Sequence, residues 1–356
     1  MKIDLEEKNN QDLNTKRNNT KLVLSIVIPS FNSKNLLLRC LEALEIQSTP
    51  KAKFEVIVTN DGSTDRTLEM LSKFQLNTNL NLKWTTIINS GPGIARNEGV
   101  NISSGSWIGF LDADVIPDPK WVENSFNLIF ENPDVGAFEG LTKVSQVEKA
   151  SPFSHQTENL DGGRYPTCNF VVRRSLAYFY PAYKIPFRED TDLAFSILKS
   201  GYEIVFAPEL IVEHPPLPSD YFRPISLARR YYYDGLLSRR FPMLYKKELD
   251  AHRFIGIKVP HLKKKLYTFF AISQLLLLFA IINGFGNNIL ITSSFVYILG
   301  IIGTSISSLR HSNILKLSLK DWLVFLMLLH ILPWIVSYSL IRGWYDFRRE
   351  PEFSRR

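Results

Sequence analysis

Apolar and polar residues follow a repeating order along positions 22–216. Short apolar runs, typical of strands buried on both faces, are mostly followed by a polar turn and then by apolar positions at helical spacing. This order predicts a doubly wound, mostly parallel α/β sheet. The expected strands cover 22–28, 54–59, 82–88, 107–111, 134–140, 169–174 and 202–207, and the expected helices end near residues 47, 74, 102, 130 and 199.

The strand expected at 107–111 leads directly into Asp112-Ala113-Asp114. Because alternate residues of an extended chain point the same way, both carboxylates can face one ligand. Neither acid has a Lys or Arg beside it in the sequence, so a divalent cation, Mg²⁺ or Mn²⁺, is the simplest partner for the pair. An Asp-x-Asp seen alone is more often a strand end whose solvated acids cap a helix.

Two more polar clusters follow expected strands, at Pro29–Asn32 and at Asn60–Asp65. Since parallel strands end at the same edge of a sheet, these clusters and the Asp-x-Asp converge where open α/β sheets bind ligands. We also expect Asn32 or Ser33 to cap the helix that ends near residue 47, and a Ser, Thr or Asp of the second cluster to cap the next helix.

A further group of acids, Glu189, Asp190 and Asp192, lies at the start of a helix predicted to end at Lys199. Acids in a first helical turn are stabilised by the helix dipole. This purely structural role is the alternative to a catalytic role for all three.

The C-terminal hundred residues contain three apolar runs, roughly 266–283, 289–308 and 322–341, each long enough to span a bilayer. Lys263–Lys265 before the first run and the basic residues after the second place both ends of a helical hairpin in the cytosol. Three crossings would then put the basic tail outside, against the positive-inside rule. Either the tail is an exception or one run is re-entrant or interfacial, and Pro333 permits a kinked or shallow third segment.

The positive charge of the chain is concentrated in one region. The formal net charge is +7, and residues 219–265 hold 12 Lys and Arg against 4 Asp and Glu. Beside membrane segments, this basic and aromatic region favours an amphipathic interfacial helix and membrane lipids, with no nucleic acid as partner.

The two cysteines, Cys40 and Cys168, give neither a disulfide framework nor a zinc pattern, which suits a reducing compartment. Residues 1–20 are expected to be a disordered tail without a signal peptide.

Five motifs, in this order and spacing, resemble the family 2 glycosyltransferases, which are inverting enzymes of the GT-A fold. The resemblance covers about residues 22–216, and each motif alone is weak. Together they favour a ligand site over a solvated strand end for the Asp-x-Asp. The motifs are Ile26–Asn32, Asn60–Asp65, Gly93–Asn97, Asp112–Asp114 and Glu189–Asp190.

The resemblance implies a nucleotide-sugar site. Asp61 would accept a hydrogen bond from a pyrimidine base, which favours a UDP-sugar, and Arg96 would lie near base and phosphate. Asp112 and Asp114 would contact ribose and metal, with Asp114 the more direct ligand. The residues that the resemblance assigns to the donor are Pro29, Ser30, Asn32, Asp61, Gly62, Arg96, Asp112 and Ala113.

The resemblance also implies the chemistry. Asp190 matches the general base, with Glu189 beside it, and His214 follows the last strand where some GT-A enzymes carry a third metal ligand. A structural or surface role for His214, before Pro215-Pro216, fits the sequence as well. One base without a nucleophile implies single displacement with inversion, in which a divalent cation (Mg²⁺ or Mn²⁺) stabilises the diphosphate leaving group.

Two segments depart from the family pattern. Residues 180–187 lack the Gly-Gly-Phe-Asp/Glu turn that often precedes the Glu-Asp pair, so the acceptor side of the site is expected to be unusual. Residues 227–235 lack a Gln-x-x-Arg-Trp motif, so processive synthesis is not supported.

The expected organisation is therefore a tail, a GT-A domain, a basic amphipathic juxtamembrane region, two to three transmembrane or re-entrant helices and a basic tail. Their boundaries are 1–20, 21–218, 219–265, 266–341 and 342–356. The expected activity is transfer of a sugar to a lipid-linked or cell-surface glycan at the cytosolic face of the inner (cytoplasmic) membrane. The alternatives are a polyprenyl-phosphate sugar transferase and a non-catalytic nucleotide-binding membrane scaffold.

Overall fold

The computed structural model describes most of the chain, apart from the N-terminus and several short segments. The described residues are 23–146, 149–155, 157–247, 249, 252–254, 257–259, 262–284, 287–309 and 314–354. The tail predicted at 1–20 lies outside them.

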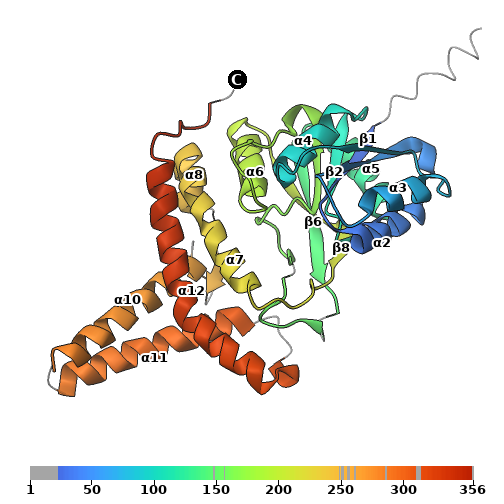
Figure 1. The fold of residues 1–356 in the computed structure, drawn as a ribbon. Helices are drawn as coiled ribbons and strands as arrows, with labels where there is room; N and C mark the ends of the chain where they lie inside the picture. The colour runs from blue at the N-terminus through green and yellow to red at the C-terminus, as the bar shows by residue number, and fades with distance from the viewer. Residues whose placement is uncertain are drawn as a thin grey trace, which may run out of the picture.

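A mixed eight-stranded sheet in the order β3-β2-β1-β4-β7-β6-β8-β5 forms the centre of the N-terminal domain (Figure 1). The predicted α/β architecture is confirmed. The strands are β1 (Leu24–Ser30), β2 (Phe54–Asn60), β3 (Leu82–Thr86), β4 (Trp107–Leu111), β5 (Ile116–Pro117), β6 (Ala137–Val144), β7 (Asn169–Arg173) and β8 (Ile204–His214).

The first four strands are parallel, so the predicted polar clusters after β1, β2 and β4 do end at one edge. The rest of the sheet is less parallel than predicted. β7 runs antiparallel to β4 and β6, because an irregular segment and not a helical crossover connects it to β6. β8 was expected to stop before Pro208 but continues to His214. A register shift opposite Gly140 and Leu141 leaves Pro208 in an unpaired stretch, where a missing N–H costs nothing.

Two apolar layers cover the sheet. Leu24, Ile26 and Ile28 of β1 pack with α2, α3 and α5 on one face, and Val27 packs with α4 and α6 on the other. This alternation follows from the two-residue period of a strand. The helices are α2 (Lys34–Glu45), α3 (Thr67–Gln75), α4 (Pro92–Asn101), α5 (Trp121–Glu131) and α6 (Glu189–Lys199), and short 3₁₀ turns lie at η1 (Lys51–Lys53) and η3 (Arg174–Leu176).

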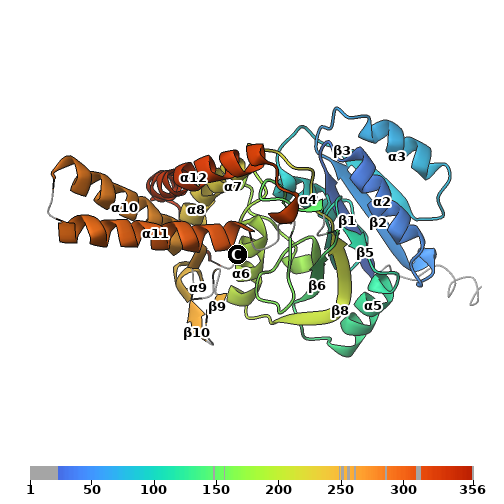
Figure 2. The same ribbon diagram turned by 90° about the horizontal axis from the view of Figure 1, so that it is seen from below.

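Helices make up most of the C-terminal part, and three of them are long and apolar enough to cross a membrane. α10 and α11 form an antiparallel pair that projects away from the sheet domain (Figures 1 and 2). The elements are α7 (Arg223–Arg229), η4 (Arg230–Tyr232), α8 (Tyr233–Arg240), α9 (Pro242–Lys247), the hairpin β9 (His252–Phe254) and β10 (Ile257–Val259), α10 (Leu262–Ile282), α11 (Asn287–Leu309), η5 (Ile314–Lys316) and α12 (Leu319–Asp346).

The third long helix, α12, packs against α7, η4 and α8 and also contacts α10 (Figure 1). At its start, the Tyr221 hydroxyl donates to Asp321 at 2.7 Å. At its end, the Tyr232 hydroxyl donates to Asp346 at 3.1 Å. Between them, a Cβ on Gly343 would collide with the carbonyl oxygen of Tyr232, so the two backbones touch only because this residue is glycine.

The chain after α12 returns to the sheet domain. The Tyr180 hydroxyl donates to Glu350, and the backbone N–H of Phe353 donates to the carbonyl oxygen of Arg240 at 2.9 Å. The Phe353 ring packs on Phe241, whose ring lies 5.2 Å away between centroids. The C-terminal tail therefore lies on the same side of the molecule as the catalytic candidates of α6.

Candidate functional site

The loop after β1 and the loop after β2 hold each other in place. Asn32 has a positive φ of 48°, and its side-chain oxygen accepts from the Thr64 N–H at 2.8 Å. The carboxylate of Asp65 accepts from the Lys34 N–H at 2.9 Å. The predicted cap for α2 is therefore wrong. Ser33 takes the N-cap position, but its hydroxyl donates to Phe31, and the cap comes from a residue 31 positions away.

Asp61 is buried at the end of β2 and fastens the start of α4. Its two oxygens accept from the backbone N–H groups of Ser90 at 2.7 Å and Gly91 at 2.9 Å. These contacts leave further lone pairs for a nucleotide base. Pro29 and Ser30 end β1 beside it, and Gly62 makes the turn with φ 76°. The nucleotide roles of these residues stay predictions.

Arg96 joins the two acidic motifs. It is buried on α4, and its guanidinium donates to Asp112 at 2.6 Å and to Glu189 at 3.3 Å. Burial alone would lower the pKa of Arg96, but the charges of Asp112 and Glu189 reverse the effect and raise it. The sequence placed Arg96 near base and phosphate. In the structure it sets the spacing between the Asp-x-Asp and the Glu-Asp pair.

Asp114 faces His214, while Ala113 between the two acids is buried in the core. The His214 Nε2 atom lies 3.8 Å from Asp114, and its Nδ1 lies 3.1 Å from the carbonyl oxygen of Pro215. A carbonyl only accepts, so the proton belongs on Nδ1, which directs the Nε2 lone pair at Asp114. Burial raises the pKa of Asp114, and a proton gained by the neighbouring His214 would oppose that rise. The sequence left His214 open between a ligand and a structural residue, and this geometry suits a ligand.

The three acids at the start of α6 have different partners. Glu189 is held by Arg96, and Asp192 is held by Arg240 through two contacts of 2.6 and 3.1 Å. Asp190 uses one oxygen to accept from the Thr191 N–H at 2.6 Å, and its other oxygen makes no hydrogen bond with the described residues. One oxygen of Glu189 also lacks a partner, but it is fully buried, whereas Asp190 is half-buried and its free oxygen is the more accessible to an acceptor.

Burial perturbs both members of the Glu-Asp pair. It raises the pKa of Glu189 to about 7, with the charge of Asp190 adding to the rise and Arg96 opposing it. Burial also raises the pKa of Asp190, while the Thr191 N–H and the charge of Arg188 act against the rise. A raised carboxyl pKa near the working pH is the property expected of a general base.

A second ion cluster, which the sequence did not reveal, links α6 to the C-terminal helices. Arg188, just before Glu189, has a φ of 73°, and its guanidinium donates to the buried Asp234 of α8 at 2.7 Å. Asp234 also accepts from Lys264 at the base of α10. Asp234 of α8 thus links the start of α6 to the first membrane-type helix, α10.

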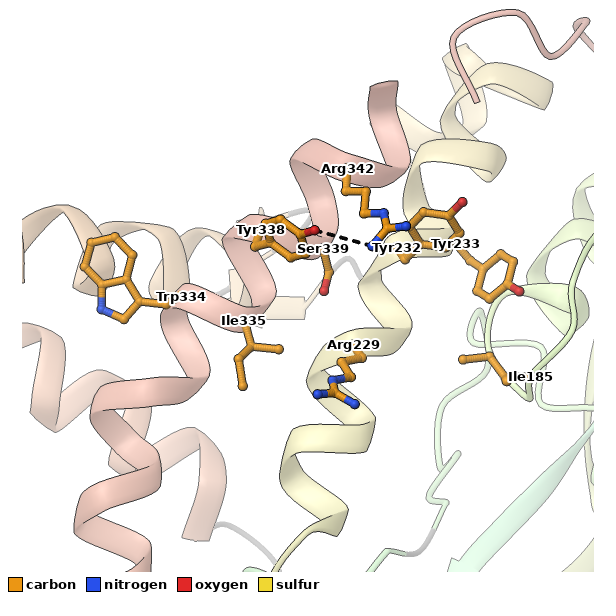
Figure 3. A pocket seen from close by; sticks show the side chains of 9 residues that line it. All are labelled: Ile185, Arg229, Tyr232, Tyr233, Trp334, Ile335, Tyr338, Ser339 and Arg342. Carbon is orange, nitrogen blue, oxygen red and sulfur yellow. Dashed lines mark hydrogen bonds between the residues drawn. The ribbon is translucent and has the colours of Figure 1, made fainter. Parts of the chain in front are cut away.

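Two cavities flank α7 and η4. The larger, of about 840 Å³, lies between α12 and the loop that precedes α6, and Figure 3 shows Arg229 of α7 projecting into it. Its residues are Ile185, Arg229, Tyr232, Tyr233, Trp334, Ile335, Tyr338, Ser339 and Arg342. The smaller, of about 330 Å³, lies between η4, the base of α10 and the first half of α12.

Residues 25–195 match the family model described as "Glycosyl transferase family 2". The domain belongs to glycosyltransferase family 2. The match covers the sheet as far as α6 and includes all five motifs.

Curated relatives agree with the family. The chain is 38% identical over 122 residues to a poly(ribitol-phosphate) beta-glucosyltransferase of Bacillus spizizenii, which covers 33% of this chain and 19% of that protein. It is 26% identical over 206 residues to glycosyltransferase AglE of Haloferax volcanii, which covers 55% of this chain and 67% of that protein. The chain thus spans about a fifth of the first relative and about two thirds of the second.

One solved glycosyltransferase shares the fold of this chain. The mannosyltransferase PcManGT from Pyrobaculum calidifontis, solved in complex with GDP-Man and Mn²⁺, aligns with a TM-score of 0.53 and 15% identity, covering 91% of this chain and 87% of that one. The predicted GT-A fold of the family 2 domain is therefore confirmed.

Several residues around the site were not identified from sequence. Asp234 holds the buried Arg188, and the buried Glu139 of β6 accepts backbone N–H groups from Gly163 and Arg164 of the following loop. His155, in that same region, packs its ring 6.4 Å from His214. The partner of Asp192, Arg240, was not identified either. The only signal in the sequence was the number of acids and arginines around the motifs, which does not say which of them pair.

Proposed function

We propose that this protein is an inverting glycosyltransferase that moves a sugar from a nucleotide diphosphate, with UDP favoured, to a lipid-linked or cell-surface glycan. One observation carries the proposal. Arg96 bridges Asp112 of the donor-side motif and Glu189 of α6, while the adjacent Asp190 keeps one oxygen without a partner among the described residues. A donor at Asp112 would therefore lie next to a carboxylate that can accept a proton.

The reaction needs one base. An acceptor hydroxyl that attacks the anomeric carbon must lose its proton, and Asp190 is the group proposed to take it. Arg96 holds one oxygen of Glu189 and the other oxygen is buried, while Arg240 holds both oxygens of Asp192, so we propose neither acid as a nucleophile. Single displacement with inversion follows from this assignment.

Asp114 and His214 are the residues proposed to hold Mg²⁺ or Mn²⁺. The part of the chain that the structure describes contains no cluster of three His, Cys, Asp or Glu with metal-binding geometry. Two protein ligands suffice in a nucleotide site, because substrate phosphates and water complete the coordination of such hard cations. The directed Nε2 of His214 and the partly buried Asp114 fit this donor set. The bound cation would neutralise charge on the diphosphate leaving group.

We assign the family 2 domain to the cytosolic side of the cytoplasmic membrane, with α10 and α11 crossing as a hairpin and α12 lying in the membrane interface. Tyr221 and Tyr232, which bond to the two ends of α12, belong to one segment with α7 and η4, so a crossing α12 would carry Arg223, Arg229 and Arg230 of that segment into the bilayer. Its outer face exposes Trp334, Tyr338 and Trp344, residue types typical of the interface. This arrangement puts all the basic segments on one side, as the positive-inside rule requires.

Two cysteine variants test the topology. The native cysteines are both buried, so Asn283→Cys in the hairpin turn and Ser354→Cys in the tail supply the accessible thiols. A membrane-impermeant maleimide applied to intact cells should label Cys at 283 and should label Cys at 354 only after permeabilisation. Labelling of both from outside would contradict an interfacial α12.

A donor screen tests the activity. The purified full chain is given UDP-sugars and GDP-sugars with Mn²⁺, Mg²⁺ or EDTA, and released nucleotide is measured with and without a membrane-lipid extract. We expect metal-dependent release from a UDP-sugar that increases with acceptor. Nucleotide binding without any turnover on the whole panel would favour a non-catalytic scaffold instead.

A further inference from the structure

The smaller cavity, of about 330 Å³, combines an apolar wall with a basic rim. The wall comes from the membrane-type helices and includes Leu329 and Val336 of α12 and Tyr267 of α10. The rim carries Arg230 of η4 and Lys263 at the base of α10. A cavity with this division fits a molecule that has an anionic head and an apolar chain.

The positive charge in this cavity has no direct partner among the described residues. Neither Arg230 nor Lys263 forms a hydrogen bond or an ion pair there, and the described lining contains no Asp or Glu. Burial lowers the pKa of the Arg230 guanidinium; Glu189 opposes this, and the positive charge of Arg223 adds to the lowering. Arg230 is half-buried, whereas Lys263 is exposed. A partly buried cation without a direct partner is unfavourable, and an anionic ligand at Arg230 would remove that cost.

The same cavity opens towards the reacting groups. Phe187, which lines it, lies two residues before Glu189, and Tyr231 of η4 packs edge-on against its ring at 5.4 Å. His155 lines the cavity from the other side and contacts His214. A head group at Arg230 would therefore lie between the proposed base and the proposed metal ligands, while its chain would extend along α10 and α12.

We propose that this cavity binds the phosphate of a lipid-linked acceptor, with Arg230 and Lys263 as its phosphate-binding residues. The inference rests on the proposed glycosyltransferase function and names the acceptor class for it. Phosphate next to an isoprenoid chain is common to a polyprenyl phosphate and to a glycan carried on a polyprenyl diphosphate. Arginine suits this role because its fork of N–H donors matches two phosphate oxygens.

Binding of farnesyl phosphate to the full chain in phosphatidylcholine nanodiscs, measured by calorimetry, tests the site. Arg230→Gln should weaken binding by about tenfold to a hundredfold, the usual effect of losing a charged hydrogen bond. Arg229→Gln is the matched control, since it removes the same charge one residue away, where Arg229 lines the other cavity. It should change binding by less than about twofold, and Arg230→Lys should restore part of it.

Further ligands separate the outcomes. Farnesol should bind much more weakly than farnesyl phosphate, and inorganic phosphate alone should not compete at equal concentration. Equal loss in the Arg229 and Arg230 variants, or equal binding of farnesol, would overturn the phosphate site, and strong competition by inorganic phosphate would overturn the lipid acceptor. UDP-sugar turnover is measured in parallel: turnover without farnesyl phosphate binding would refute only the acceptor site, whereas binding without turnover would refute the proposed function.

Discussion

Replacing Asp190 with Asn removes the proposed base and little else. The Asn side chain has the same size, and its amide oxygen can still accept from the Thr191 N–H, the 2.6 Å contact that holds this side chain. No ion pair is lost, because the salt bridges of this helical turn belong to Glu189 and Asp192. Loss of general-base catalysis lowers a rate by about 10²–10⁴-fold, or about 3–5 kcal/mol in the activation barrier.

The thermal stability of Asp190→Asn should stay the same or increase, although its activity falls. Burial raises the pKa of Asp190 above its ordinary value, so the ionised carboxylate is disfavoured in the folded state at neutral pH. An acid with a raised folded-state pKa reduces stability above that pKa, and removing its charge removes the penalty. Asp190→Asn should therefore unfold at the same temperature as the wild type or higher, while its turnover collapses.

The pH profile provides an independent check. A base works only when deprotonated, and burial raises the pKa of Asp190 above its ordinary value, so the transfer rate should fall on the acid side at a higher pH than an ordinary aspartate would give. The assay is transfer of labelled sugar to a hydroxyl acceptor from pH 5 to 9, with Glu189→Gln as comparison. Near-normal turnover in Asp190→Asn, or a larger loss in Glu189→Gln, would refute the assignment of Asp190 as the base.

Three further variants separate structural from functional acids. Asp192→Asn leaves the buried Arg240 with a weaker partner, so the free energy of unfolding should fall by up to about 3–5 kcal/mol in a thermal or denaturant melt, with folded enzyme still active. EDTA should abolish turnover and Mn²⁺ should restore it, whereas Asp114→Asn should not be rescued at ordinary Mn²⁺ concentrations, as nucleotide release will show. Asp61→Asn can accept from only one of its two backbone partners, so it should lose about 1–2 kcal/mol of stability and bind UDP more weakly in calorimetry.

The convergence of the motifs could be predicted because it depends on chain direction alone. Once 24–30, 54–60 and 107–111 are parallel strands, the polar residues that follow each must meet at one edge of the sheet. Period-two and helical apolar spacing identified these strands and the helices between them. The departure occurred at β7, where a long irregular connection allowed the strand to return antiparallel.

The partners inside the site could not be predicted, because pairing depends on tertiary distance. Arg96 reaches Asp112 across 16 residues and Glu189 across 93. Asp192 meets Arg240 across 48 residues. Three acids of nearly equal chemistry therefore occupy one helical turn with three different roles, and composition near the motif carries no information about which arginine approaches which acid.

Mean hydropathy alone does not establish that α12 spans a membrane. An 18-residue window of this helix has a mean hydropathy of 2.1, which satisfies a membrane span, yet the helix has two apolar faces with different neighbours. Phe325, Leu329 and Val336 are buried, while Leu323 and Tyr338 on the other face are exposed. A mean over the window adds both faces together and cannot distinguish a span from a helix that packs on a domain and touches lipid along one side. The sequence held one further clue, because three spans would put the basic tail outside, against the positive-inside rule, whereas the proposed interfacial α12 keeps that tail beside the sheet domain.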